Sequence, residues 1–191
     1  MRVQIVAGDD ILAAFGNQIA ALGAGDARKA LARAVNRTTT TVRSRVIRAI
    51  VKQSSIPRAI VAKQVKQRLA STRLDGGALE GVVYASGRPI SLKYFQAHQF
   101  SWGVRAKVYG QWQRFPHAFM GPKPGIIAPA LHGNVFMRIN VKRTPIRMLE
   151  GPSVPEEMIR GEAKKVFEET VATMLPERVR HEIGRLLPGG E

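Results

Sequence analysis

The side chains that could perform acid–base, nucleophilic or metal chemistry are few and scattered in this sequence. The four histidines, at positions 98, 117, 132 and 181, show no HExxH motif and no paired spacing, and the aspartates are confined to positions 9, 10, 26 and 75. Cysteine is absent, which excludes disulfides and thiolate metal sites and suits a protein assembled in a reducing cytoplasm. We therefore expect no catalytic residue, metal site or cofactor, and the protein is predicted not to be an enzyme.

Two patterns that could bind phosphates or bases have simpler interpretations. The Gly-Ala-Gly-Asp turn at residues 23–26 precedes a predicted helix, but no Lys-Ser or Lys-Thr pair follows it, so it is interpreted as a linker with a helix cap. Near Lys93 and Arg105 lie four aromatic residues, Tyr94, Phe95, Phe100 and Trp102. They could stack on bases, but aromatic residues beside a strand more often belong to the core, and no RNP-like motif is present.

Positive charge is concentrated in the middle of the chain. There are 30 Lys and Arg residues against 14 Asp and Glu residues, which gives a net charge of +16. Residues 27–149 contain 23 of the basic residues and only two acidic ones, whereas the rest of the chain carries 7 basic and 12 acidic side chains. A basic middle favours a polyanion or an acidic surface on a neighbouring subunit, and the composition fits both.

A long helix is predicted from Asp26, which can cap it, to about Val51. Apolar residues from Leu31 to Val42 recur at helical spacing and form one stripe. The four threonines at positions 38–41 are weak helix formers, so a kink or a frayed turn is expected there.

Basic residues form a ladder on a neighbouring face of this predicted helix. Lys29, Arg33 and Arg37 follow one another at four-residue steps, and Arg48 lies three turns further along. The ladder either faces phosphates or an acidic partner, or is an ordinary solvated helix face, and the sequence fits both interpretations equally.

The remaining elements alternate between helix and strand signals. We expect a helix at residues 11–22, a short helix that begins at Pro57 and carries Ile60, Val61 and Val65, strands at residues 78–85, 102–108, 118–120 and 134–141, and a C-terminal helix. The period-two alternation at residues 102–108 is the clearest strand signal. Residues 121–133 contain three prolines and three glycines and are expected to form a long loop. Pro176 is expected to kink or end the C-terminal helix, which should pack on the sheet.

These elements predict an α+β fold in a single domain over residues 1–191. Its parts are an N-terminal helix (1–25), basic helices including one long one (26–70), an antiparallel sheet of about four strands with loops (78–150) and a C-terminal helix (155–187). A chain of 191 residues with 45% apolar content can bury about 70% of its unfolded surface, so one core is plausible. No signal peptide or membrane span is evident, and a soluble protein is expected.

Residues 133–155 contain, in this order, a predicted strand, basic residues and a proline-rich segment that leads into the C-terminal helix. Val135, Phe136, Met137 and Ile139 are expected to form a strand with buried apolar side chains, and Arg138, Lys142, Arg143 and Arg147 place positive charge along and after it. Prolines 145, 152 and 155 each fix a backbone angle and bias the preceding residue toward extended or turn geometry. Such a segment is suited to presenting a surface.

This order of motifs resembles the minor tail protein Z family of long-tailed bacteriophages. The segment begins with Gly133, Val135, Phe136 and Arg138, continues with Arg143, Pro145 and Ile146, and ends in Gly-Pro-Ser-Val-Pro at residues 151–155. Similar blocks cover most of the chain: Ala32, Ala34, Asn36 and Arg37; Ser55, Ile56 and Pro57; Ile90, Leu92 and Phe95; Ala118 and Phe119.

The resemblance implies a structural virion protein that completes the head-proximal end of the tail and supports head–tail joining. It implies a location in the neck region of the virion tail, and in the host cytoplasm during assembly. The implied partners are copies of the chain in a ring and neighbouring tail or neck proteins, with packaged DNA as a further contact; no membrane and no small-molecule substrate are expected. The candidate partner-binding residues are Lys29, Arg33, Arg37, Arg48, Arg138, Arg143 and Arg147. The alternative is a basic nucleic-acid-binding module that contacts DNA phosphates.

Overall fold

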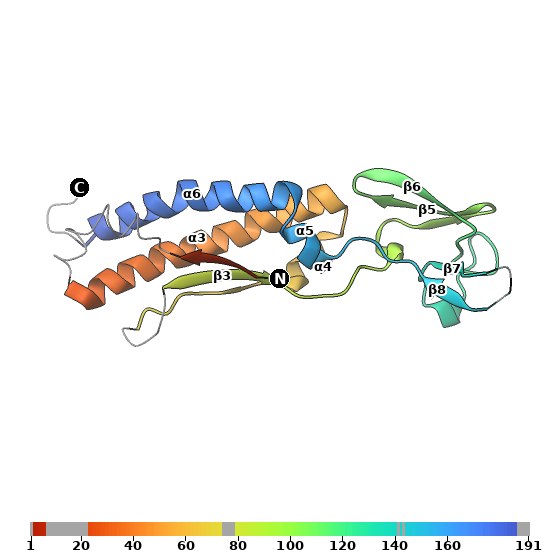
Figure 1. Cartoon of the computed structure of the whole chain (residues 1–191), viewed down its shortest axis with the longest axis horizontal. Coiled ribbons are helices and arrows are strands. Elements are labelled where there is room, and N and C mark those ends of the chain that lie inside the picture. Colours follow the sequence, from red (N-terminus) through yellow and green to blue (C-terminus); the bar gives the residue numbers. More distant parts are fainter. Residues whose placement is uncertain (1, 7–22, 74–78, 141, 143, 187–191) are drawn as a thin grey trace.

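The structure, a computed structural model, describes residues 2–6, 23–73, 79–140, 142 and 144–186, with residues 2–6, 23 and 24 described by their backbone alone. The helix expected at residues 11–22 and the candidate Arg143 lie outside these residues. The molecule is elongated, with two long helices and one sheet at one end and two further sheets at the other (Figure 1). We call these ends the helical half and the distal half. The α+β fold expected from the sequence is confirmed.

In the helical half, the long helix α3 (Gly23–Ser54) lies between a second long helix and a sheet (Figure 1). The sheet is antiparallel in the order β1-β3-β2, formed by β1 (Arg2–Val6), β3 (Glu80–Ala85) and β2 (Val65–Arg68). The second helix is α6 (Gly161–Gly184), which lies along α3. The expectation that the C-terminal helix packs on the sheet is therefore wrong, because α3 separates the two.

The helix α3 can occupy this middle layer because it is apolar on more than one side. Its buried apolar residues are Ala27, Ala30, Leu31, Ala32, Ala34, Val35, Val42, Val46, Ile47, Ala49 and Ile50. Many of them are alanines, which let neighbouring backbones approach closely. At the closest point, an added Cβ on Gly81 of β3 would lie 1.9 Å from Thr39 Oγ1, so a glycine is needed there.

The threonines at positions 38–41 do not interrupt α3, contrary to expectation. Thr38 and Thr39 are fully buried, and their hydroxyls donate to the carbonyl oxygens of Ala34 and Val35 at 2.9 and 2.7 Å. Such bonds to the carbonyl four residues earlier satisfy a buried hydroxyl within a helix. The helix also begins at Gly23, earlier than the cap expected at Asp26, which lies in the first turn instead.

The expected short helix is present as α4 (Arg58–Gln64), but it begins one residue later than predicted, because Pro57 is its N-cap residue. Val65, which was expected to belong to this helix, is instead the first residue of β2 and is fully buried. The strand β3 covers most of the strand predicted at residues 78–85. Its neighbours β1 and β2 were not predicted: β1 alternates polar and apolar residues only over the short segment 2–5, and β2 contains a single apolar residue, Val65.

The distal half contains two sheets where part of one larger sheet was expected. One has the antiparallel order β4-β5-β6, from β4 (His98–Phe100), β5 (Gly103–Val108) and β6 (Gln111–Pro116); the other pairs β7 (Phe136–Arg138) with β8 (Ile146–Met148). The predicted alternation in β5 is confirmed, with Val104, Ala106 and Val108 buried. The single sheet of about four strands is thus replaced by three small sheets.

Two of the predicted strands in the distal half are shorter than expected. Residues 118–120 contribute only an isolated bridge between Phe119 and Phe136, and residues 134–141 only the three residues of β7. Ile139, expected to be buried, is exposed. The proline-rich residues 121–133 form the expected loop, with one helical turn, η2 (Pro129–Leu131).

The chain returns to the helical half through α5 (Val154–Met158), which Ser153 caps by accepting a bond from the Glu156 backbone. The helix α6 then runs through Pro176 and does not end there. Of the apolar residues that the sequence places at helical spacing after this proline, Val179 and Ile183 are buried and Leu186 is exposed; Leu175, directly before the proline, is buried as well. The burial of Leu175, Val179 and Ile183 offsets the backbone hydrogen bond that a proline removes.

The turn between β5 and β6 connects the distal half to the end of α3. The Tyr109 backbone N–H donates to the Ser54 carbonyl oxygen at 3.3 Å, and the Gly110 N–H donates to Ser55 Oγ at 2.7 Å. Both Tyr109 and Ser55 adopt positive φ angles, which places them in tight turns. The backbone of the β5–β6 turn is therefore hydrogen-bonded to the helical half, once to a carbonyl oxygen and once to a serine hydroxyl.

A buried carboxylate strengthens the same connection. Gln53 Nε2 donates to Glu157 Oε2 at 2.7 Å and to the Glu157 carbonyl oxygen at 2.8 Å, and Gln53 Oε1 accepts from the Ala163 backbone at 3.1 Å. The Tyr109 hydroxyl donates to Glu157 Oε1 at 3.2 Å. Partial burial, together with the negative charge of Glu157, raises the pKa of Tyr109 above its usual value. The hydroxyl thus remains a donor at neutral pH.

Candidate functional site

The ladder predicted on α3 exists and is longer than expected. Lys29, Arg33, Arg37 and Arg48 are all exposed on one face of the helix. Arg45 and Lys52 extend the same face toward the C-terminal end of α3. The three- and four-residue spacing was visible in the sequence, so both residues could have been included.

The N-terminal part of the ladder is bound within the molecule. Lys29 Nζ lies 3.1 Å from Asp26 Oδ1, and Arg33 and Arg37 lie 3.8 and 3.0 Å from the carboxylate of Glu182 on α6. The Glu182 side chain is only 1% exposed, whereas the two arginines are about half exposed. The contacts are ionic and not aligned as hydrogen bonds. Part of the charge on Arg33 and Arg37 therefore serves to compensate a buried carboxylate.

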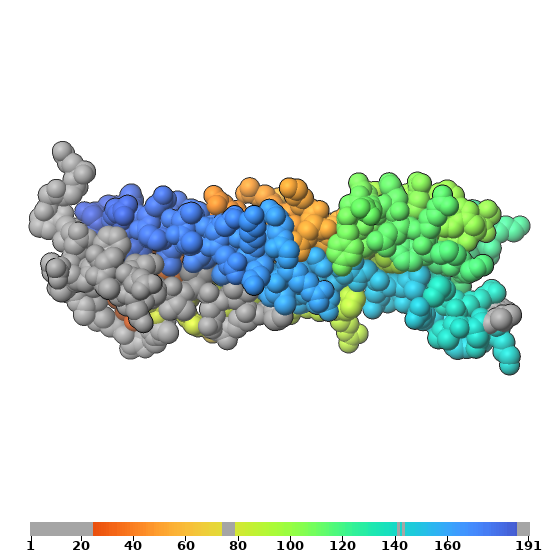
Figure 2. All heavy atoms as spheres, turned by 45° about the horizontal axis from the view of Figure 1, so that its top comes forward, coloured from red at the N-terminus to blue at the C-terminus, as the bar shows by residue number. Residues whose placement is uncertain are grey.

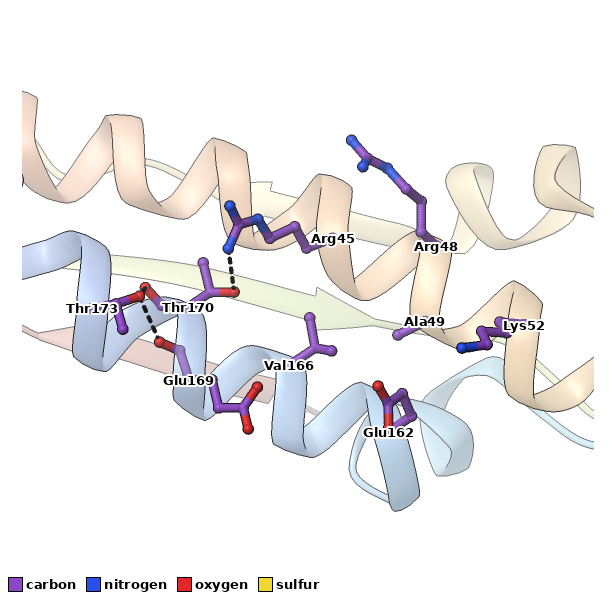
Figure 3. Close-up of a pocket in the computed structure, with 9 residues that line it drawn as sticks. All are labelled: Arg45, Arg48, Ala49, Lys52, Glu162, Val166, Glu169, Thr170 and Thr173. Atoms are coloured by element: carbon purple, nitrogen blue, oxygen red, sulfur yellow. Dashed lines mark hydrogen bonds between the residues drawn. The ribbon is translucent and has the colours of Figure 1, made fainter.

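The C-terminal part of the ladder borders a groove between α3 and α6, shown in Figure 3. The groove has a volume of about 490 Å³ and an apolar floor that includes Ala49 and Val166. Arg45 reaches across it and donates to Thr170 Oγ1 at 3.3 Å, whereas Arg48 points away from α6 (Figure 3). Two carboxylates, Glu162 and Glu169, lie on the α6 side.

Arg48 and Lys52 are the residues of this face best placed for a partner. Within the part of the chain that the structure describes, neither of them forms an ion pair. They are exposed, and they lie on a regular helix that holds their Cα atoms at a fixed spacing. An external anion would therefore not have to break an internal ion pair at these two positions.

The second predicted basic surface lies in the distal half, away from most of α3 (Figure 1). The guanidinium carbon of Arg138 on β7 lies 5.8 Å from the centre of the Phe119 ring. Arg147 on β8 is paired with Met137, not with Arg138, so the two arginines point to opposite faces of the hairpin. The predicted residues therefore do not form one site. They are divided between α3 and two faces of the distal hairpin.

A third surface, on the β4-β5-β6 sheet, was not predicted to be a binding surface. On the outer face of the β4-β5-β6 sheet, five side chains stack in the order Trp112, Arg105, Phe100, Trp102 and Arg114, which we call the aromatic–arginine stack. Phe100, Trp102 and Trp112 are 38–45% exposed, although the first two were expected in the core. The alternation of Trp112 and Arg114 in β6 was the signal that could have revealed this face.

The histidines remain dispersed over the molecule. Within the described ranges, no group of three or more His, Asp or Glu side chains is arranged to hold a metal ion. Among the same residues, no helix is both long and apolar enough to cross a membrane. No protein family, curated protein or solved structure matches this chain. The likeness to the tail protein family thus remains a prediction from the sequence motifs.

Proposed function

We propose that this chain is a structural protein of a bacteriophage tail. It completes the head-proximal end of the tail and supports head–tail joining, through contacts with copies of itself in a ring and with neighbouring tail or neck proteins. The motif order in residues 133–155 supports the phage assignment. The surface of the distal half supports the role in assembly.

The observation that carries the assembly role is the exposure of large apolar side chains in the distal half. The described residues include eleven exposed large apolar side chains, and all except Leu69 and Leu186 lie between Tyr94 and Met148. Exposed large apolar side chains gathered in one part of a protein favour an interaction surface there, because such surfaces expose apolar and aromatic residues. Figure 2 shows this half, in green and cyan, projecting beyond the helices.

The architecture suits a subunit that joins neighbours. The two long helices and their sheet supply a rigid body, and the connection through Gln53, Tyr109 and Glu157 fixes the distal half on it. Each copy then presents its distal half and its α3 face at a set separation. Contacts of this head-to-tail type close into rings when the rotation between subunits is right.

Head–tail joining in the phage or prophage that encodes the chain tests the proposal. Particles without the protein are expected to contain tails that fail to join heads, and the wild-type chain should restore joining when it is supplied in trans. The double variant Ile126→Ser/Ile127→Ser, which alters exposed side chains of the distal half, should restore it poorly. The matched control Leu69→Ser, exposed in the helical half, should restore it fully. Infectious particles that lack the protein would refute the proposal.

The second candidate function is the binding of duplex DNA by the exposed face of α3. The observation in its favour is that Arg48 and Lys52 lie side by side on this face. Anisotropy titration of the purified chain with a labelled duplex at two salt concentrations is the test, because each phosphate contact releases counterions. Arg48→Gln/Lys52→Gln should then lower the slope of log affinity against log salt by about 2, roughly 1 for each lost contact. No binding at low salt would eliminate this function.

A further inference from the structure

We propose that the aromatic–arginine stack is a docking site for a protein segment in which carboxylates flank large apolar side chains. This inference rests on the assembly role proposed above, because it assumes a protein partner. It adds the chemistry of that partner and the residues that recognise it.

The stack holds its two arginines in fixed orientations. The Arg105 guanidinium carbon lies 4.5 Å from the centre of the Trp112 ring and 5.5 Å from that of Phe100, and the Arg114 guanidinium lies 5.2 Å from the centre of the Trp102 ring. Arginine stacked on a ring loses less side-chain freedom when it binds, and its planar fork matches a carboxylate. The outward N–H groups are thus prepared for an anion.

The charge of this region is not balanced from within. Arg105 and Arg114 are directly opposite each other on β5 and β6, and the rings of Phe100 and Trp102 lie between their guanidinium groups in the stack. Residues 81–149 contain ten Lys and Arg residues and no Asp or Glu. In addition, Arg105 Nε is buried without a hydrogen-bond partner in the described structure. A partner that supplies carboxylates would neutralise the positive charge of the two guanidinium groups.

The apolar part of the partner follows from the neighbouring groove. Phe100 and Trp102 also line a groove of about 1310 Å³ between the two distal sheets, and its other walls include Phe119, Leu131 and Met137. Stack and groove are therefore one continuous surface. A segment that places carboxylates on the arginines can at the same time place apolar side chains in the groove.

The packing of the rings favours a protein partner over single-stranded nucleic acid. Bases bind to aromatic side chains by stacking on an open ring face. Here Phe100 and Trp102 stack on each other, with centres 5.4 Å apart and planes within 5°, and arginines cover further faces. A base would have to displace a guanidinium, whereas a carboxylate needs only its outward edge.

Tryptophan fluorescence tests the inference directly, because Trp102 and Trp112 are the only tryptophans of the chain. The probe is a capped hexapeptide, Glu-Leu-Glu-Phe-Glu-Leu, titrated into the purified full-length protein. We expect a saturable change in emission, and binding at least about tenfold weaker for the matched peptide with Gln in place of Glu. No emission change, equal binding of the Gln peptide, or tighter binding of a dodecathymidine oligonucleotide would overturn the inference.

Charge-conserving variants separate the stack from general electrostatics. Arg105→Lys/Arg114→Lys keeps the net charge but removes both planar guanidiniums, so binding of the Glu peptide should weaken by about tenfold or more. Arg88→Lys, at an exposed position outside the stack, should leave it unchanged. Equal binding by all three proteins would contradict the role of the stack. The result is independent of the test of head–tail joining, since joining could require the protein even if the peptide fails to bind.

Discussion

Replacing both Arg33 and Arg37 with Gln is expected to lower the free energy of unfolding by about 2–4 kcal/mol. The change leaves the carboxylate of Glu182, which is 1% exposed, without the two cations that lie 3.8 and 3.0 Å from it. Removing one partner of a fully buried ion pair lowers the free energy of unfolding by about 3–5 kcal/mol. We expect a smaller loss of about 2–4 kcal/mol here, because solvent reaches the half-exposed arginines and screens their charge. Urea unfolding, followed by circular dichroism, measures the effect.

A triple variant supplies the matched control. Adding Glu182→Gln to the double variant removes the buried charge itself, so most of the lost stability should return. If the double variant unfolds at the same urea concentration as the wild type, the two arginines do not stabilise Glu182. In that case Arg33 and Arg37 would again be candidates for binding a partner. The experiment therefore distinguishes a structural from a binding role for the middle of the ladder.

Replacing Gln53 with Leu is expected to destabilise the protein by about 2–4 kcal/mol and to loosen the distal half. The substitution removes both bonds that Gln53 donates to Glu157 and the bond that it accepts from the Ala163 backbone. Glu157, 5% exposed, would keep only the Tyr109 hydroxyl as a side-chain donor among the described residues. A buried carboxylate that loses a donor costs more than a neutral group would.

Two measurements report on this variant. Urea unfolding gives the loss of stability, and hydrogen exchange at the amides of Tyr109 and Gly110 reports on the connection itself, where protection should fall. The control is Gln113→Leu, an exposed position on β6, which should stay within about 0.5 kcal/mol of the wild type. Unchanged protection at both amides in the Gln53 variant would show that the hydrogen bonds to the Ser54 carbonyl oxygen and the Ser55 hydroxyl suffice to hold the connection.

The parts of the fold that the sequence predicted are those with strong local periodicity. The apolar stripe of α3, the alternation in β5 and the spacing of Val179 and Ile183 after Pro176 all produce a pattern within a single segment. The layer order was not predictable in this way. The layer order depends on α3 being apolar on more than one side. Many of its buried residues are alanines, so in the sequence only one narrow apolar stripe is evident.

For the candidate site, too, the sequence predicted local patterns but not contacts between distant residues. The spacing of the ladder predicted which residues share a face, but the buried partner of Arg37 is Glu182, 145 positions away in the sequence. The aromatic–arginine stack depends on the register of β5 against β6, which sets Arg105 opposite Arg114. No pattern within one strand contains that pairing. The sequence thus indicated the basic residues and left their pairing to tertiary structure.

The length of α3 has a consequence for how one subunit could serve two neighbours. Its 32 residues span about 48 Å at 1.5 Å per residue, and the distal half is fixed at its C-terminal end. The helix therefore sets a fixed distance between its N-terminal end and the distal half. A partner held at the N-terminal end of α3 and one held by the distal half would be kept several nanometres apart, at a distance counted in helical turns.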